Sequence, residues 1–118
     1  MEIRKGVYEH YKGKRYEVIG LAKPDKPKGD SYGWAGTARH TECIEKQIDV
    51  LYSLNPAGSE GEFWIPNSQV EGEMVFYRAL YNDPKFGNNA LWLRPIKMFL
   101  EKVVVDGKKV PRFKFVGK

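Results

Sequence analysis

The stretch of sequence that decides the fold is VFYRALYNDPKFGNNALWLRPIKMF, residues 75–99. Its first seven residues are β-branched, aromatic or otherwise apolar apart from one arginine, which is the composition of a β-strand. The turn formers Asn82, Asp83 and Pro84 then end the run. Alternation leaves both faces of this strand, Val75–Tyr81, largely apolar. Both faces therefore need covering, and we expect the strand to be central in its sheet.

A second strand is predicted a few residues later in the same stretch. Leu91 and Leu93 alternate with Trp92 and Arg94, and Pro95 ends the run because proline has no backbone N–H to donate to a sheet. The two strands therefore form a hairpin. Its arginines and aromatic residues are typical of a binding surface, and it contains no recognisable catalytic signature.

Two more hairpins are predicted toward the ends of the chain. The strand-like residues 6–11 and 15–22 are separated by three residues that include Gly13, and a glycine there supplies the positive φ of a tight turn. Residues 102–116 contain an Asp-Gly pair between β-forming residues, which is one of the stronger short-range turn signals.

The segment Thr37–Tyr52 is ambiguous. Ile44, Ile48 and Leu51 have helical spacing, but the segment is rich in β-branched residues, which favour strands. We expect a strand before Glu42 and leave the remainder open between strand and helix. Together these segments give about five to seven short strands with frequent turns, which predicts a small all-β barrel or roll.

Two segments look like long loop insertions, approximately residues 23–36 and 46–73, because prolines and glycines interrupt both. The first contains Tyr32 and Trp34, whose rings are too hydrophobic to remain in water. We expect this loop to fold back and pack both rings against the barrel. A loop as long as the second is uncommon unless it packs as a flap or performs a task.

The composition is that of a soluble globular protein in a single domain over residues 1–118. No apolar run approaches the roughly 18 residues that span a bilayer, and the first residues lack an apolar signal core, so we expect a cytoplasmic protein with no membrane partner. Cys43 is the only cysteine, which excludes an internal disulfide and a thiolate metal site. We expect its thiol to be buried and inert.

Charge is segregated along the chain, whose formal net charge is +5. Residues 42–73 carry seven carboxylates against one lysine, whereas residues 102–118 carry six cationic side chains against one carboxylate. This asymmetry could attract an anionic partner such as nucleic acid. The alternative is that both regions are solvated faces, or that they pair with each other in the fold.

Six motifs, taken in chain order, carry a resemblance to a known family. They are GVYEHYKG (Gly6–Gly13), YEVIGLA (Tyr16–Ala22), ARHTE (Ala38–Glu42), VFYRALY (Val75–Tyr81), LWLRPIKMF (Leu91–Phe99) and VDGKKVPRF (Val105–Phe113). With these motifs the chain resembles the bacterial domain of unknown function 1653 (DUF1653) family, whose compact form the two insertions interrupt. The resemblance implies a small roll of the SH3-like barrel type and implies no activity.

His10 and His40, together with Glu42, are the candidates for chemistry, as acid and base groups or as metal ligands. A metal site usually has at least three protein ligands with short spacing between some of them, which this set lacks, so we predict no metal and no cofactor. No nucleophile elbow, zinc-protease motif or phosphate-binding glycine loop is present. The alternative role for each histidine is structural, hydrogen-bonded beside an aromatic ring.

Four side chains are the candidates for ligand binding: Tyr11, Arg78, Trp92 and Arg94. An arginine in an otherwise apolar strand needs an acceptor, because an unpaired buried charge is costly. For Arg78 that acceptor is either internal, such as Glu42 or Glu73, or a carboxylate, phosphate or base of a ligand. Trp92 and Arg94 share a strand face and could offer a stacking plane beside a cation. The alternative is that Trp92 belongs to the core.

The leading interpretation is a non-enzymatic binding module with an arginine and aromatic surface for an anionic or extended ligand, which could be nucleic acid. One alternative is a small enzyme that uses His10, His40 and Glu42. Another is a protein-interaction subunit or a homodimer whose contact includes the apolar run Phe63–Ile65. The first two differ in a simple observation, which is whether the histidines and the carboxylate gather in one pocket with Arg78.

Overall fold

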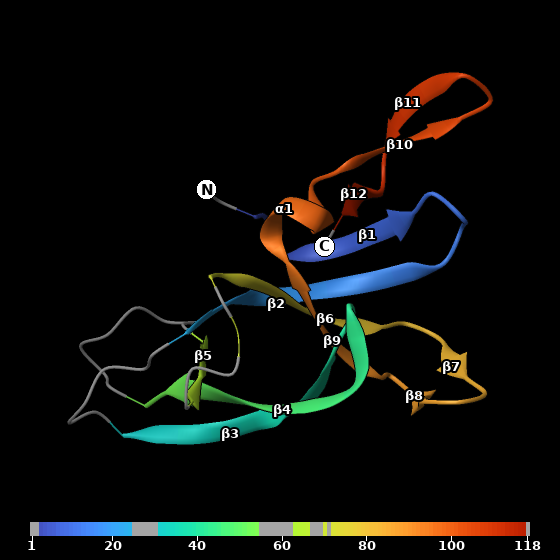
Figure 1. The fold of residues 1–118 in the computed structure, drawn as a ribbon. Helices are drawn as coiled ribbons and strands as arrows, with labels where there is room; N and C mark the ends of the chain where they lie inside the picture. Colours follow the sequence, from blue (N-terminus) through green and yellow to red (C-terminus); the bar gives the residue numbers. More distant parts are fainter. Residues whose placement is uncertain (1–2, 25–30, 55–62, 67–69, 71, 118) are drawn as a thin grey trace.

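The computed structural model describes residues 3–24, 31–54, 63–66, 70 and 72–117. Within these residues the chain forms twelve strands and one helical turn (Figure 1). The strands are β1 (Gly6–His10), β2 (Arg15–Pro24), β3 (Tyr32–His40), β4 (Cys43–Ser53), β5 (Phe63–Ile65), β6 (Met74–Ala79), β7 (Asn82–Asp83), β8 (Gly87–Asn88), β9 (Leu91–Pro95), β10 (Lys102–Val105), β11 (Lys108–Pro111) and β12 (Phe113–Gly117), and the helix is α1 (Ile96–Phe99). This helix is not long or apolar enough to cross a membrane, and no other α-helix lies in the described part of the chain.

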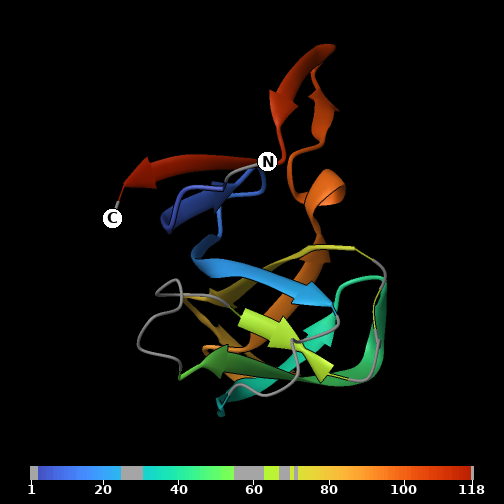
Figure 2. The same ribbon diagram turned by 90° about the vertical axis from the view of Figure 1, so that its left-hand side faces the viewer.

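Six of the strands close into a barrel. The main sheet has the order β12-β1-β2-β5-β4-β3-β9-β6, and β6 also pairs with β2, so the strands from β2 to β6 in this order form a ring. Figure 2 shows the six strands around a common interior, with the β10–β11 hairpin projecting away from them. The predicted all-β class is confirmed. The predicted count of five to seven strands is too low, because several strands are only two or three residues long.

Strand β6 is central, as its composition predicts. It pairs antiparallel with β2 on one side and with β9 on the other, so the predicted hairpin with β9 is also confirmed. Its side chains alternate between two cores: Phe76 points into the barrel, whereas Val75 and Tyr77 point to the opposite face. All three side chains are buried, which explains why neither face of this strand is polar.

The two cores differ in composition. The barrel core is mostly aliphatic and receives side chains from all six barrel strands: Ala22, Ala38, Ile48, Val50, Ile65, Val70, Met74, Phe76 and Leu93. The outer core is mostly aromatic and lies between the β2–β6 wall and the elements β1, α1 and β12: Tyr8, Val18, Val75, Tyr77, Phe99 and Phe113. Phe99 stacks on Phe113 with ring centroids 4.2 Å apart, which anchors α1 to β12.

Much of the two segments expected to be loops is strand. Residues 32–36 begin β3, residues 46–53 continue β4, and β5 joins β2 to β4 in the barrel. The prediction that Trp34 packs against the barrel is wrong, because this side chain points outward from β3 and is 66% exposed. Cys43, expected to be buried, starts β4 and is exposed. Trp34 precedes a register irregularity in β3, between Trp34 and Gly36, and lies on the opposite face from the buried Ala38. Cys43 belongs to the first five residues of β4, all of which are exposed.

The predicted turn of the β10–β11 hairpin is confirmed. Asp106 and Gly107 have φ angles of 52° and 80°, the left-handed pair that a two-residue hairpin turn requires. The returning strand differs from the prediction, because it is interrupted at Arg112. After the interruption β12 leaves the hairpin and pairs with β1.

Candidate functional site

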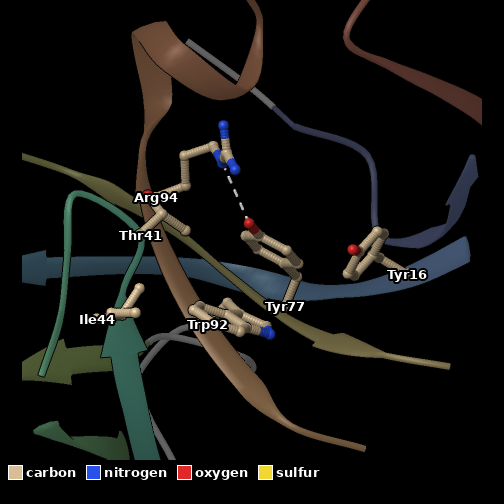
Figure 3. A pocket seen from close by; sticks show the side chains of 6 residues that line it. All are labelled: Tyr16, Thr41, Ile44, Tyr77, Trp92 and Arg94. Carbon is tan, nitrogen blue, oxygen red and sulfur yellow. Dashed lines mark hydrogen bonds between the residues drawn. The ribbon is translucent and has the colours of Figure 1, made fainter. Parts of the chain in front are cut away.

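A pocket of about 250 Å³ lies where the start of β2, the β3–β4 turn and the hairpin strands β6 and β9 meet. Six side chains line it: Tyr16, Thr41, Ile44, Tyr77, Trp92 and Arg94. Figure 3 shows Thr41 and Ile44 on one side and Tyr16 on the other, with the remaining three between them. The pocket is therefore built from segments that are far apart in the sequence.

Strand register brings these side chains together. Tyr77 and Trp92 are directly opposite each other on β6 and β9, and Arg94 follows on the same face of β9 two residues later. The β3–β4 turn is held beside them because β3 pairs with β9 in parallel. The backbone N–H of Thr41 also donates to the carbonyl of Leu93 over 2.9 Å.

Arg94 is half-buried and has no carboxylate partner among the described residues. Its Nε donates to the Tyr77 hydroxyl over 3.1 Å, and its guanidinium carbon lies 5.4 Å from the centroid of the Phe113 ring. By contrast, Arg15, Arg78 and Arg112 each pair with a glutamate. The Arg94 side chain is thus positioned by neutral groups, and its positive charge has no negatively charged partner among the described residues at the pocket.

Two further polar atoms at this pocket lack a hydrogen-bond partner. They are the indole Nε1 of Trp92 and the hydroxyl Oγ1 of Thr41, both buried. A buried polar group without a partner costs about 1–3 kcal/mol, and such groups are uncommon in folded proteins. Their presence in the walls of one pocket, next to an uncompensated cation, marks this place as different from the rest of the structure.

The tyrosines of the pocket stay neutral at physiological pH. Burial, followed by the hydrogen bond with Tyr81, raises the pKa of Tyr16, and burial also raises the pKa of Tyr77. The hydroxyls of Tyr16 and Tyr81 are 2.7 Å apart. The charge at the pocket is therefore that of Arg94.

The four predicted binding residues separate into two groups. Trp92 and Arg94 both line the pocket, as their shared strand face suggests. Arg78 points away from it and pairs with Glu17, Nε to Oε1, at 2.6 Å, so its acceptor is internal but is neither of the two glutamates considered from the sequence. Tyr11 is 40% exposed at the β1–β2 turn and lines a separate groove.

The histidines do not gather into one site. His10 lies at the end of β1, its ring contacts Phe113, and its Nδ1 accepts the backbone N–H of Lys12. His40 ends β3, and its Nδ1 accepts the backbone N–H of Glu42. Burial, with nearby cations, lowers the pKa of both imidazoles, so both are neutral at pH 7. Among the residues that the structure describes, no cluster of three or more metal-binding side chains occurs.

Four of the pocket residues were not identified as candidates from the sequence: Tyr16, Thr41, Ile44 and Tyr77. Thr41 lies between His40 and Glu42, and its hydroxyl carries no acid or base signal of its own. Tyr77 could have been found from its position, because it faces Trp92 across the predicted hairpin. Tyr16 and Ile44 carried no such signal, since their contact with the hairpin depends on how the barrel closes.

A family model described as protein of unknown function (DUF1653) matches residues 64–115. This confirms the resemblance predicted from the sequence. The matched segment extends from β5 to β12 and contains Tyr77, Trp92 and Arg94, whereas Tyr16, Thr41 and Ile44 lie outside it. No curated protein and no solved structure matches the chain.

Proposed function

We propose that this DUF1653-like chain is a non-enzymatic binding module whose pocket holds an anionic group of its ligand against Arg94 and a flat group against Trp92. The observation that carries the proposal is the uncompensated charge of Arg94 in a pocket walled by aromatic rings. A half-buried cation loses part of its hydration. An anionic group of a ligand would provide the negative charge and the hydrogen-bond acceptors that the protein does not supply to Arg94.

The size of the pocket limits what it accepts. Its volume of about 250 Å³ is slightly below the roughly 300–1,000 Å³ of pockets that enclose a whole drug-sized ligand. One ring with an attached anionic group fits this space better than a large cofactor. The aromatic walls favour a planar ring, because stacking and edge contacts add to the burial of apolar surface.

The test compares a charged probe with its neutral counterpart. Uridine monophosphate, uridine and benzoate are titrated separately while the indole N–H signal of Trp92 is followed by NMR. The signal is identified by its loss in Trp92→Phe. We expect saturable shifts with the two anions, and affinity at least about tenfold weaker for uridine, since a hydrogen bond to a charged group contributes about 1.5–3 kcal/mol.

Two arginine variants supply the control. Arg94→Gln keeps a donor for Tyr77 but removes the charge, so it should weaken binding of both anions toward the level of uridine. Arg78→Gln removes the same charge from the neighbouring strand, outside the pocket, and should leave the affinity unchanged. Equal losses in the two variants, or no saturable shift with either anion, would refute the proposal.

A further inference from the structure

Three hairpin tips point to the same side of the molecule, the right-hand side in Figure 1. They are the β1–β2 turn, the β7–β8 hairpin and the β10–β11 hairpin. Each tip carries lysines with exposed side chains: Lys12 and Lys14 on the first, Lys85 on the second, and Lys108 and Lys109 on the third. None of these five lysines forms an ion pair with a described carboxylate.

The three tips form one surface, because the β1–β2 turn lies between the other two. Toward β7–β8, Nζ of Lys14 lies 4.3 Å from the centroid of the Tyr81 ring, and this lysine also acts electrostatically on Asp83. Toward β10–β11, a groove of about 620 Å³ separates the turn from the hairpin, with Tyr11 on one wall and Lys108 on the other.

The nearby carboxylates are largely engaged elsewhere. Glu9 pairs with Arg15. Asp83 accepts the backbone N–H groups of Lys85 and Phe86, over 2.7 and 3.0 Å, and these bonds lower the pKa of its carboxyl. Asp106 remains as the exposed acidic residue of the β10–β11 turn. On balance the surface carries an excess of positive charge that faces solvent.

We propose that these tips form a track for the phosphates of single-stranded nucleic acid. Lysines spaced over three tips suit a ligand whose negative charges repeat along its length, which a small anion does not offer. The pocket has room for one planar ring, so one base of the strand would occupy it; this last point rests on the proposed function, whereas the track does not.

The apices of the tips favour nucleic acid over an anionic membrane. A surface that enters a lipid headgroup layer inserts apolar side chains at its tips, but the apices here are Lys12-Gly13, Pro84-Lys85-Phe86 and Asp106-Gly107. Phe86 packs edge-on against Trp92, and the exposed Val104 and Val105 precede the third apex within β10. Tyr11 is the exposed aromatic residue beside them, with the Lys12 ammonium 5.8 Å from its ring centroid. An aromatic ring beside a cation is the arrangement on which bases stack in proteins that bind single strands.

The test measures how salt weakens the binding of a labelled oligothymidylate of about 12 nucleotides, a length within the roughly 4–16 that one small barrel covers. Affinity is determined by fluorescence anisotropy at several salt concentrations. In the double variant Lys108→Gln/Lys109→Gln we expect weaker binding and a logarithmic salt slope that is shallower by about 0.7 for each phosphate that the variant no longer neutralises. A wild-type slope in this variant, or no binding by wild-type protein at low salt, would overturn the track.

The matched control removes the same charge from another part of the surface. Lys5 precedes β1 and Lys97 lies on α1, both exposed and away from the tips, so Lys5→Gln/Lys97→Gln should keep the wild-type slope. If both double variants lose affinity equally, the effect is one of net charge and the track is refuted.

Two more measurements separate the track from the pocket and from a membrane. Uridine monophosphate should bind the Lys108→Gln/Lys109→Gln variant as it binds wild type, so failure of the pocket and failure of the track give different patterns. Vesicles of phosphatidylserine and phosphatidylcholine are the second measurement. Binding to the vesicles that depends on Lys108 and Lys109, without binding to the oligonucleotide, would assign the surface to a membrane and overturn the proposal.

Discussion

The two cores on either side of β6 differ in how they are enclosed and in how many polar groups they contain. The barrel core is closed on all sides by six strands, and its members carry no polar side-chain group apart from the thioether of Met74. The outer core is covered on one side only, by β1, α1 and β12, and it includes the hydroxyls of Tyr8 and Tyr77. Strand β6 contributes side chains to both cores, because successive residues of a strand point to opposite faces.

The difference explains where a site can form. An aliphatic interior offers no group that recognises a ligand, so the barrel core contributes stability and little else. The outer core has aromatic rings with polar ends, and these reach its open side, where Tyr77 accepts a hydrogen bond from Arg94. Barrel stability and the proposed recognition of a ligand are thus assigned to neighbouring residues of a single strand.

The largest effect is expected from Phe76→Ala, which empties the centre of the barrel core. Phe76 is 1% exposed, and replacing a fully buried phenylalanine by alanine costs about 3–5 kcal/mol through reduced burial and the cavity left behind. Urea denaturation followed by circular dichroism measures the loss. A cost below about 1 kcal/mol would contradict the assignment of stability to the barrel core.

A smaller effect is expected from Tyr77→Phe, one residue along the same strand. The ring and its packing remain, but the hydroxyl that accepts from Nε of Arg94 is removed, which we expect to cost about 1–2 kcal/mol because the donor is charged and half-buried. The same denaturation experiment applies. The variant should also free the Arg94 guanidinium, so the salt dependence of the affinity for uridine monophosphate should change. In Phe76→Ala, by contrast, binding should change only to the extent that the protein is unfolded.

The smallest effect is expected from Trp34→Ala, on the outer surface of the barrel. Trp34 is 66% exposed, and its one described polar contact is a long hydrogen bond of 3.4 Å from Nε1 to Asp49. Substitutions at such surface positions usually change stability by no more than about 0.5 kcal/mol. A melting temperature well below that of wild type would show that this ring contributes to packing after all.

The sequence was sufficient to predict the class of the fold and its central hairpin. Val75–Tyr81 is apolar on both faces, and this property follows directly from having a core on each side. The closure of the barrel could not be predicted, because β2 pairs with β5 and β3 with β9 in parallel, and no local turn signals such pairings. The outward position of Trp34 could not be predicted either, because it depends on a register irregularity in β3 between Trp34 and Gly36.

The candidate site was predicted in part, for a related reason. Trp92 and Arg94 could be identified together because alternation within one strand places them on one face. Arg78 is also an arginine in an apolar strand, and for that reason the sequence places it in the same group. It directly follows Tyr77 in β6, however, so its side chain points to the opposite face, where Glu17 lies opposite it. Tyr16 and Thr41 come from segments that meet β9 only through the three-dimensional arrangement of the strands.

The two parallel pairings have a consequence for the order in which the chain acquires its structure. Of the six barrel pairings, β3–β4, β4–β5 and β6–β9 join neighbouring segments, whereas β2–β5, β2–β6 and β3–β9 join segments far apart in the sequence. Pairings between distant segments slow folding, because the entropy of closing a long loop is given up before the contacts form. Tyr16, Thr41 and Trp92 belong to three of these separate segments. We therefore expect the pocket to form only when these distant pairings are made, and if the proposed function holds, an anion bound there should stabilise the closed barrel.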